Sequence, residues 1–175
     1  MIINYPLDKD KLKDIHVGDV IEFSGVIYTA RDAAHMRIKN MLEKGEELPV
    51  DFNEAFIYYA GPTPTKPGHV IGSIGPTTSS RMDMFAPMMR QLNVCATIGK
   101  GPRDNACTKY YQDNHILYFI TTGGCGALLS KAVKKAKEIA FLDLGPESIK
   151  RLEVEGFKMI CAIDYYGNNI FDGGK

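Results

Sequence analysis

Short apolar segments alternate along the chain with segments whose apolar residues recur at helical spacing, and this alternation limits the fold more than any other feature. The run at 20–28 (VIEFSGVIY) is β-branched and aromatic, which favours a strand. Residues 32–44 follow it with a single apolar stripe, which favours a helix that ends at Gly45. Strands that alternate with helices are typical of a layered α/β domain.

The remaining segments predict more elements of both kinds. Asp32 is expected to cap the first helix, and Ser80 with Asp83 has the spacing of a capping box for another. Pro87 conflicts with a regular helix there, so we expect a distorted or late start. The segment 61–68 (GPTPTKPG) predicts a rigid loop. Further strands are expected at 56–59, 94–98, 116–120, 139–142 and 157–163, and further helices at 105–112, 127–137 and 147–152.

Size and charge exclude several classes of function. The 175 residues, 45% of them hydrophobic, fit one compact domain over residues 1–175. The 21 Lys and Arg residues balance 21 Asp and Glu residues, so no broad electrostatic field attracts nucleic acid or an anionic membrane. Charges interrupt the N-terminal segment too early for a signal peptide, and no run reaches the length of a membrane span. We therefore expect a soluble, cytoplasmic protein that binds any anion locally.

The cysteines and glycines argue against two other kinds of site. Cys95, Cys107, Cys125 and Cys161 are spread along the chain without a C-x-x-C pair and without a histidine at ligand spacing, so no metal site is predicted within this chain. A phosphate- or nucleotide-binding enzyme is a weak hypothesis, because the Gly-rich stretch at 121–131 lacks the spacing of a P-loop.

Three predicted junctions between a strand and a helix carry cations and hydroxyls. They contain Arg31, then Thr77 with Arg81, and then Lys100. Such junctions gather at one edge of the sheet in α/β domains. Arginine can grip a carboxylate with two parallel hydrogen bonds and lysine adds a point charge, so the three junctions together resemble a dicarboxylate clamp. For each residue alone, the alternative is a cation that serves solubility or caps a helix C-terminus.

Two further residues are candidates with competing interpretations. His35, one turn into the first predicted helix, is either a group that transfers a proton or orients a ligand, or a histidine at the helix surface or cap. Cys125 is either a reactive thiol at a helix N-terminus or a small buried residue.

Five motifs carry a resemblance over nearly the whole chain. In order and content they resemble the β subunit, or C-terminal region, of class I fumarate hydratases and L-tartrate dehydratases. That resemblance implies a swivelling β/β/α layered single domain, like the mobile domain of aconitase-type enzymes. The motifs are YTARDAAH at 28–35, YYAGPTP at 58–64, IGSIGPTTSSRMD at 71–83, IGKG at 98–101 and TTGGCGALL at 121–129.

The resemblance also implies a shared active site. A partner α subunit would hold a 4Fe-4S cluster that acts as a Lewis acid, and the assembly would be a hetero-oligomer. Arg31 and Arg81 would bind the substrate carboxylates, Lys100 would complete the charged pocket and stabilise developing negative charge, and Thr77 would be the base. The implied reaction is the reversible hydration of fumarate to malate, or else the dehydration of tartrate to oxaloacetate. The rival hypothesis is a non-catalytic module that binds a small anion or regulates another protein.

Overall fold

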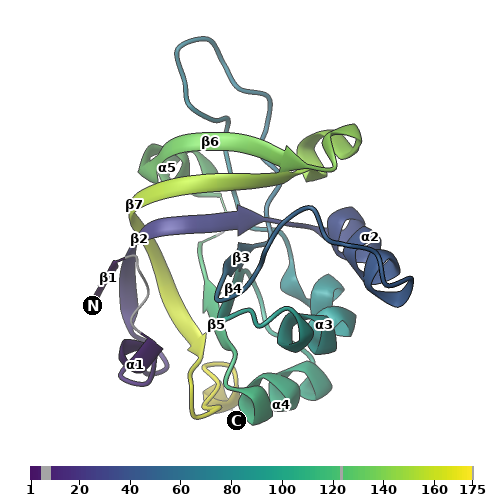
Figure 1. Ribbon diagram of the computed structural model, residues 1–175. Helices are drawn as coiled ribbons and strands as arrows, with labels where there is room; N and C mark the ends of the chain where they lie inside the picture. Colours follow the sequence, from purple (N-terminus) through teal and green to yellow (C-terminus); the bar gives the residue numbers. More distant parts are fainter. Residues whose placement is uncertain (5–8, 123, 175) are drawn as a thin grey trace.

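The computed structural model describes residues 1–4, 9–122 and 124–174. In this part of the chain a seven-stranded sheet is surrounded by short helices (Figure 1). The strands are β1 (Ile2–Asn4), β2 (Val20–Thr29), β3 (Phe56–Tyr58), β4 (Ala96–Gly99), β5 (Leu117–Ile120), β6 (Val133–Ala140) and β7 (Ile149–Ile163). The α-helices are α1 (Lys9–Leu12), α2 (Asp32–Glu43), α3 (Ala86–Gln91), α4 (Asn105–Asn114) and α5 (Gly126–Ala132), and the 3-10 helices are η1 (Ser79–Phe85), η2 (Leu142–Glu147) and η3 (Asp172–Gly174).

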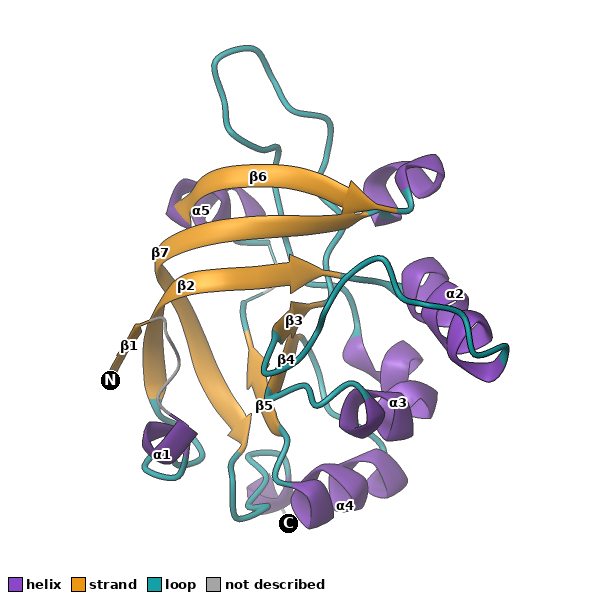
Figure 2. Ribbon diagram, in the orientation of Figure 1, coloured by secondary structure: helices purple, strands orange, loops and turns teal. Residues whose placement is uncertain are grey.

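The sheet closes on itself through the long strand β7. β2, β3, β4 and β5 run parallel in that order, and β7 is antiparallel to both β5 and β2. Ile27 pairs with Leu152 at one end of this closure, and Phe119 pairs with Cys161 at the other. Figure 2 shows β7 bending from its place beside β6 toward β5. The expected α/β domain is confirmed, and its sheet has a barrel-like form.

Two apolar clusters lie on the two faces of this sheet. Phe56 and Tyr58 of β3 belong to a cluster that draws on β2, β3, β4, β5 and β7 and so fills the interior of the barrel. Ile57 and Tyr59 point the other way, into a cluster that includes buried residues of α2, α3 and α4. Because both faces are covered, β3 is buried at every residue, as strands of parallel sheets usually are. Among the described residues, no helix is long and apolar enough to cross a membrane.

Most of the predicted elements occur in the structure. The strand expected at 20–28 is β2, and the helix that follows it is α2, after which Gly45 adopts a positive φ of 68°. The segment 61–68 is a loop without helix or strand, as predicted. Confirmed to within two residues at each end are the strands at 56–59, 94–98 and 116–120 and the helix at 105–112, and the strand at 157–163 is the second half of β7.

The helix predicted at 127–137 is wrong in its second half. α5 ends at Ala132, and Val133 begins β6, which pairs along its length with β7. Lysine and alanine favour a helix in isolation, but the hydrogen bonds offered by the edge of β7 outweigh a preference of a few tenths of a kcal/mol per residue.

The same pairing explains two smaller errors nearby. The helix predicted at 147–152 is wrong, because β7 already begins at Ile149 and η2 occupies the preceding residues. The strand predicted at 139–142 ends at Ala140, as the last part of β6.

Both predicted side-chain caps are also wrong. Asp32 is the first residue of α2, whose N-cap is Arg31, and no side chain caps that helix. Asp83 does not close a capping box, because its carboxylate binds Arg103. The distorted start expected from Pro87 is confirmed: η1 is a 3-10 helix, and α3 begins only at Ala86, with the proline in its first turn.

Candidate functional site

The residues that follow the parallel strands meet at one edge of the sheet. Arg31 lies two residues after β2, and Lys100 directly follows β4. The backbone N–H of Thr77 donates to the carbonyl of Tyr59, which directly follows β3, at 2.7 Å. Thr78 forms a parallel bridge with Lys100. The three junctions predicted from the sequence are therefore brought together at the carboxyl ends of neighbouring strands.

Arg81 and Thr77 are in direct contact at this edge. Arg81 Nη2 donates a hydrogen bond of 2.6 Å to Thr77 Oγ1, and the same nitrogen lies 3.2 Å from Asp32 Oδ2. The Arg81 side chain remains 47% exposed, so a molecule arriving from solvent can reach it. Asp32, assigned to helix capping from the sequence, instead stands between the cations, since its Oδ2 is also 3.8 Å from Arg31 Nε.

Two acidic side chains lie beside Arg31, and a nearby glycine leaves space for it. Its Nε lies 3.7 Å from Oε1 of Glu147. Glu147 belongs to η2 and was not among the residues predicted from the sequence. This Nε is buried and makes no hydrogen bond within the described part of the chain. Gly61 leaves room for the guanidinium, because a Cβ there would lie 3.2 Å from Arg31 Nη1 and 3.1 Å from the Pro146 carbonyl oxygen. The sequence could not predict that Glu147 pairs with Arg31, because the two residues are far apart along the chain.

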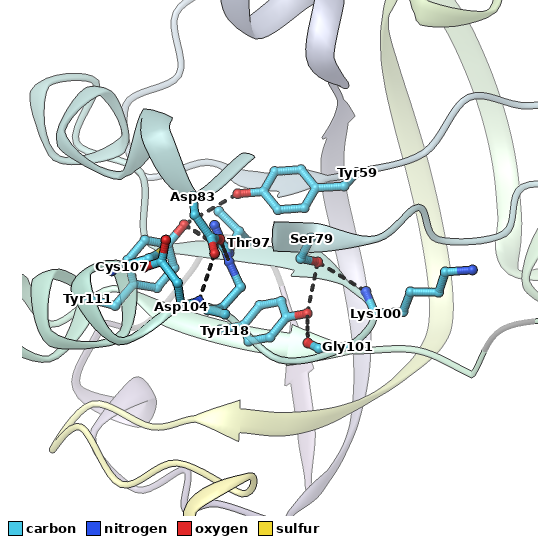
Figure 3. Close-up of polar contacts among 11 residues, drawn as sticks. Tyr59, Ser79, Asp83, Thr97, Lys100, Gly101, Asp104, Cys107, Tyr111 and Tyr118 are labelled. Carbon is cyan, nitrogen blue, oxygen red and sulfur yellow. Dashed lines mark hydrogen bonds and ion pairs between the residues drawn. The ribbon is translucent and has the colours of Figure 1, made fainter. Parts of the chain in front are cut away.

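Lys100 is fixed through its backbone while its side chain is exposed. Its N–H donates to Ser79 Oγ at 3.1 Å, and its carbonyl accepts from the Ser79 N–H at 3.0 Å. Gly99 permits this close approach, because a Cβ at that position would collide with Ser79 Oγ. Figure 3 shows the Lys100 side chain extending away from Ser79.

A buried ion pair, which the sequence pattern did not indicate, lies behind this edge. The Arg103 side chain is 0% exposed, and its Nε donates to the carboxylate of Asp83, which is 4% exposed. The guanidinium carbon stands 4.9 to 5.4 Å from the ring centres of Tyr59, Tyr111 and Tyr118. Cation–π contacts of this kind stabilise a cation most when it is desolvated.

His35 lies in the core, so its interpretation as a helix-surface residue is wrong. Its Nδ1 is 2.8 Å from the carbonyl oxygen of Arg31, and its ring packs against Tyr59 and Phe85. Burial lowers the pKa of His35 to about 4, which keeps the ring neutral, so that Nδ1–H is the donor to this carbonyl. In the described residues no hydrogen bond joins the ring to Thr77, so its contact with the site runs through the backbone of Arg31.

The cysteines do not form a metal site in the described part of the chain. Cys107 and Cys161 are buried, Cys95 and Cys125 are half-buried, and no group of three or more His, Cys, Asp or Glu side chains is placed to hold a metal ion there. The residues present therefore do not fit an iron–sulfur cluster. Cys125 occupies the N-cap position of α5, which has only seven residues. Of the two glycines before it, Gly123 lies outside the described residues.

Comparisons with known proteins extend over almost the whole chain. The family model described as Fumarase C-terminus matches residues 2–174. A putative L(+)-tartrate dehydratase subunit beta of Methanocaldococcus jannaschii is 43% identical over 172 residues, which cover 95% of this chain and 88% of that protein. The L(+)-tartrate dehydratase subunit beta of Escherichia coli is 35% identical, over 99% of this chain and 88% of that protein.

Longer proteins also match. Fumarate hydratase 2 of Leishmania major is 35% identical over 170 residues, which cover 95% of this chain but only 30% of that protein. The chain thus spans most of the tartrate dehydratase subunits and less than a third of this fumarate hydratase.

Proposed function

This chain belongs to the fumarase C-terminus family, whose named members reported above are hydro-lyases or their subunits, and on that premise we propose that it is the β subunit of a hydro-lyase acting on a small dicarboxylate. The observation that carries the proposal is the contact of Arg81 with Thr77 at the edge where Arg31 and Lys100 also lie. This contact supports the proposal, because it joins the proposed carboxylate-binding cation to the proposed base.

The cations supply the dicarboxylate clamp. Arg81 Nη2 donates to Thr77 Oγ1 and is the nitrogen in the ion pair with Asp32, while Arg31 pairs with its acidic neighbours through Nε at 3.7 and 3.8 Å. The remaining N–H groups of both guanidinium forks make no hydrogen bond within the described part of the chain, so each fork can bind a substrate carboxylate. Lys100 adds a point charge that stabilises the negative charge formed when a proton leaves the adjacent carbon.

Thr77 is the proposed base. A neutral threonine is a weak base, but the charged hydrogen bond from Arg81 Nη2 favours the alkoxide form of Oγ1. In the direction of dehydration, this alkoxide accepts the proton from the carbon next to one carboxylate. The electron pair left on that carbon forms the new C=C bond as the C–O bond of the neighbouring carbon breaks. The departing hydroxide takes up the proton that Thr77 accepted and leaves as water, which restores the alkoxide.

The remaining parts of the enzyme are assigned to a partner. Because the described residues do not fit a metal cluster, we propose that a partner α subunit holds the 4Fe-4S cluster and that the cysteines of this chain take no part in binding it. The 70% of the Leishmania fumarate hydratase that this chain does not cover supports a separate region for that role. In this cytoplasmic hetero-oligomer, the domain would swivel to close over the substrate, like the mobile domain of aconitase-type enzymes.

The substrate is fumarate or malate in our leading proposal. Tartrate is the second candidate, because the two separate subunits reported above, which this chain covers to 88%, are named for tartrate dehydratase. The same clamp suits both acids.

An anaerobic pull-down followed by an assay tests the proposal. We expect the chain to capture an iron-containing partner, and the complex to hydrate fumarate or to dehydrate tartrate, while the isolated chain is colourless and inactive. Turnover by the metal-free chain alone would contradict the shared site. Tight dicarboxylate binding by the chain, without any iron partner or turnover, would favour the rival module that only binds an anion.

A further inference from the structure

Two connections join the segment that carries Thr77 and Arg81 to the segment that carries Lys100. The first is formed by Ser79, whose backbone N–H and side-chain Oγ both bond the backbone of Lys100. The second is formed by Asp83, which lies two residues beyond Arg81 in η1. Its Oδ1 accepts from Arg103 Nε, and its Oδ2 accepts from the backbone N–H of Asp104 at 2.7 Å.

Arg103 stands at the centre of the second connection and also reaches the first. Its guanidinium packs over the ring of Tyr118, whose hydroxyl lies 2.8 Å from Ser79 Oγ and 2.7 Å from the Gly101 carbonyl oxygen (Figure 3). Arg103 Nη1 lies 3.3 Å from Thr97 Oγ1 in β4. One buried cation therefore contacts η1 through Asp83, β4 through Thr97, β5 through Tyr118 and α4 through Tyr111.

From this arrangement we infer that Arg103 is a positioning residue, which holds Arg81 and Lys100 in the geometry needed to bind a dicarboxylate. The dicarboxylate substrate in this inference rests on the proposed function, whereas the positioning of Arg81 and Lys100 by Arg103 rests on the contacts alone. Stability alone gives a poor account of Arg103, since replacing a buried ion pair with apolar side chains of similar size is often neutral or stabilising. Its Nη2 is, moreover, buried without a hydrogen-bond partner in the described part of the chain.

The first test compares variants in the complete complex with its iron-bearing partner. Arg103→Met is expected to lower kcat/KM by roughly 10²-fold, because a displacement of about 1 Å in substrate-binding groups has an effect of that size. Arg37→Met is the matched control. Arg37 also pairs with a carboxylate, that of Asp143, and stacks on an aromatic ring, that of Phe141, but it lies on the exposed side of α2. Its kcat/KM should stay at the wild-type value.

A double variant separates positioning from a merely structural role. Asp83→Asn combined with Arg103→Met removes both buried charges, so the melting temperature should recover relative to Arg103→Met alone, while kcat/KM stays low. If melting temperature and kcat/KM recover together, Arg103 is only structural. Wild-type kcat/KM in a folded Arg103→Met complex would likewise overturn the inference.

A second measurement does not depend on the lyase activity. In the isolated chain, Arg103→Met should speed amide hydrogen exchange at Ser79 and Asp104, whose N–H groups make the two connections, while the amides shared by β2 and β7 stay protected. Unchanged exchange at Ser79 and Asp104 would overturn the inference even if the complex were active. If the wild-type complex proves inactive, the proposed function fails, and the exchange result still decides the role of Arg103.

Discussion

At the scale of single residues, the contact between Arg81 and Thr77 determines what the hydroxyl can do. Thr77 Oγ1 accepts a hydrogen bond from a cation, and this positive charge stabilises the alkoxide form that the proposed base requires. A hydroxyl that served only its own turn would bond a nearby backbone group instead. The observed partner is the side chain of Arg81, four residues along the chain, which agrees with a chemical role.

Thr77→Val tests that role, because valine keeps the shape and removes the hydroxyl. We expect kcat to fall by roughly 10²- to 10⁴-fold, the usual contribution of general acid–base catalysis, with little change in KM. Thr78→Val is the control and should be milder. Steady-state kinetics and melting temperatures of both reconstituted complexes decide the matter. A folded, fully active Thr77→Val enzyme would exclude Thr77 as the base.

The two arginines of the clamp make a separate prediction. Arg31→Ala and Arg81→Ala should each lose most activity without unfolding the domain, since a hydrogen bond to a charged group contributes about 1.5–3 kcal/mol. Arg37→Ala, which removes an arginine from the same helix region but not from the site, should retain activity. Near-normal turnover in both clamp variants, measured beside circular dichroism melts, would show that the clamp lies elsewhere.

His35 makes stability depend on pH. Burial lowers its pKa in the folded state from 6.5 to about 4, so between these values the unfolded chain binds the proton and the folded chain does not. The free energy of unfolding therefore keeps its full value with respect to His35 above pH 6.5. It decreases as the pH falls from 6.5 toward 4, by about 3 kcal/mol in total. Urea unfolding between pH 7.5 and 5 measures this slope.

Two variants identify the source of that slope. His35→Phe should flatten it, whereas His69→Gln, at an exposed position, should leave it unchanged. An equally steep profile in His35→Phe would mean that other groups cause the pH dependence.

At the scale of elements, the junction between β4 and the start of η1 requires a glycine. A Cβ at Gly99 would collide with Ser79 Oγ, so Gly99→Ala must either turn this hydroxyl away from the Lys100 N–H or push the two segments apart. We expect the free energy of unfolding to fall by about 1–3 kcal/mol, as in other overpacked sites, and activity to fall with it. Gly173→Ala is a neutral control, because a Cβ there meets no atom within 4 Å. Unchanged stability and activity in Gly99→Ala would show that the junction between β4 and η1 does not require a glycine at this position.

The elements that the sequence predicted correctly are those set by local pattern. β2 and α2 combine the right residue types with the right period, so neighbours in sequence suffice to specify them. The segment after Ala132 could not be predicted in this way, because its lysines and alanines favour a helix and only pairing with β7 makes it a strand. A partner that lies later in the chain is invisible to any local pattern.

At the scale of the whole molecule, the same limit applies to the site. The junction motifs located Arg31, Thr77, Arg81 and Lys100 at one edge, since strand ends meet there in any α/β domain. The acidic partners of the arginines, and the buried Arg103, depend on which distant segments pack together. Only the closed sheet brings Glu147 to Arg31 across more than a hundred residues.

The closure by β7 also governs when this molecule can fold. Ile21 pairs with Met159, so the interior of the barrel is sealed by a strand made long after β2 has left the ribosome. Contacts of such large sequence separation form slowly, because the entropy of closing a long loop is lost before they form. During synthesis, Ile21, Phe23 and Ile27 therefore lack the partner strand that buries them. Until β7 is synthesised, the apolar side chains of β2 are exposed, and the growing chain is prone to aggregation. Chaperones can bind this apolar surface during that time.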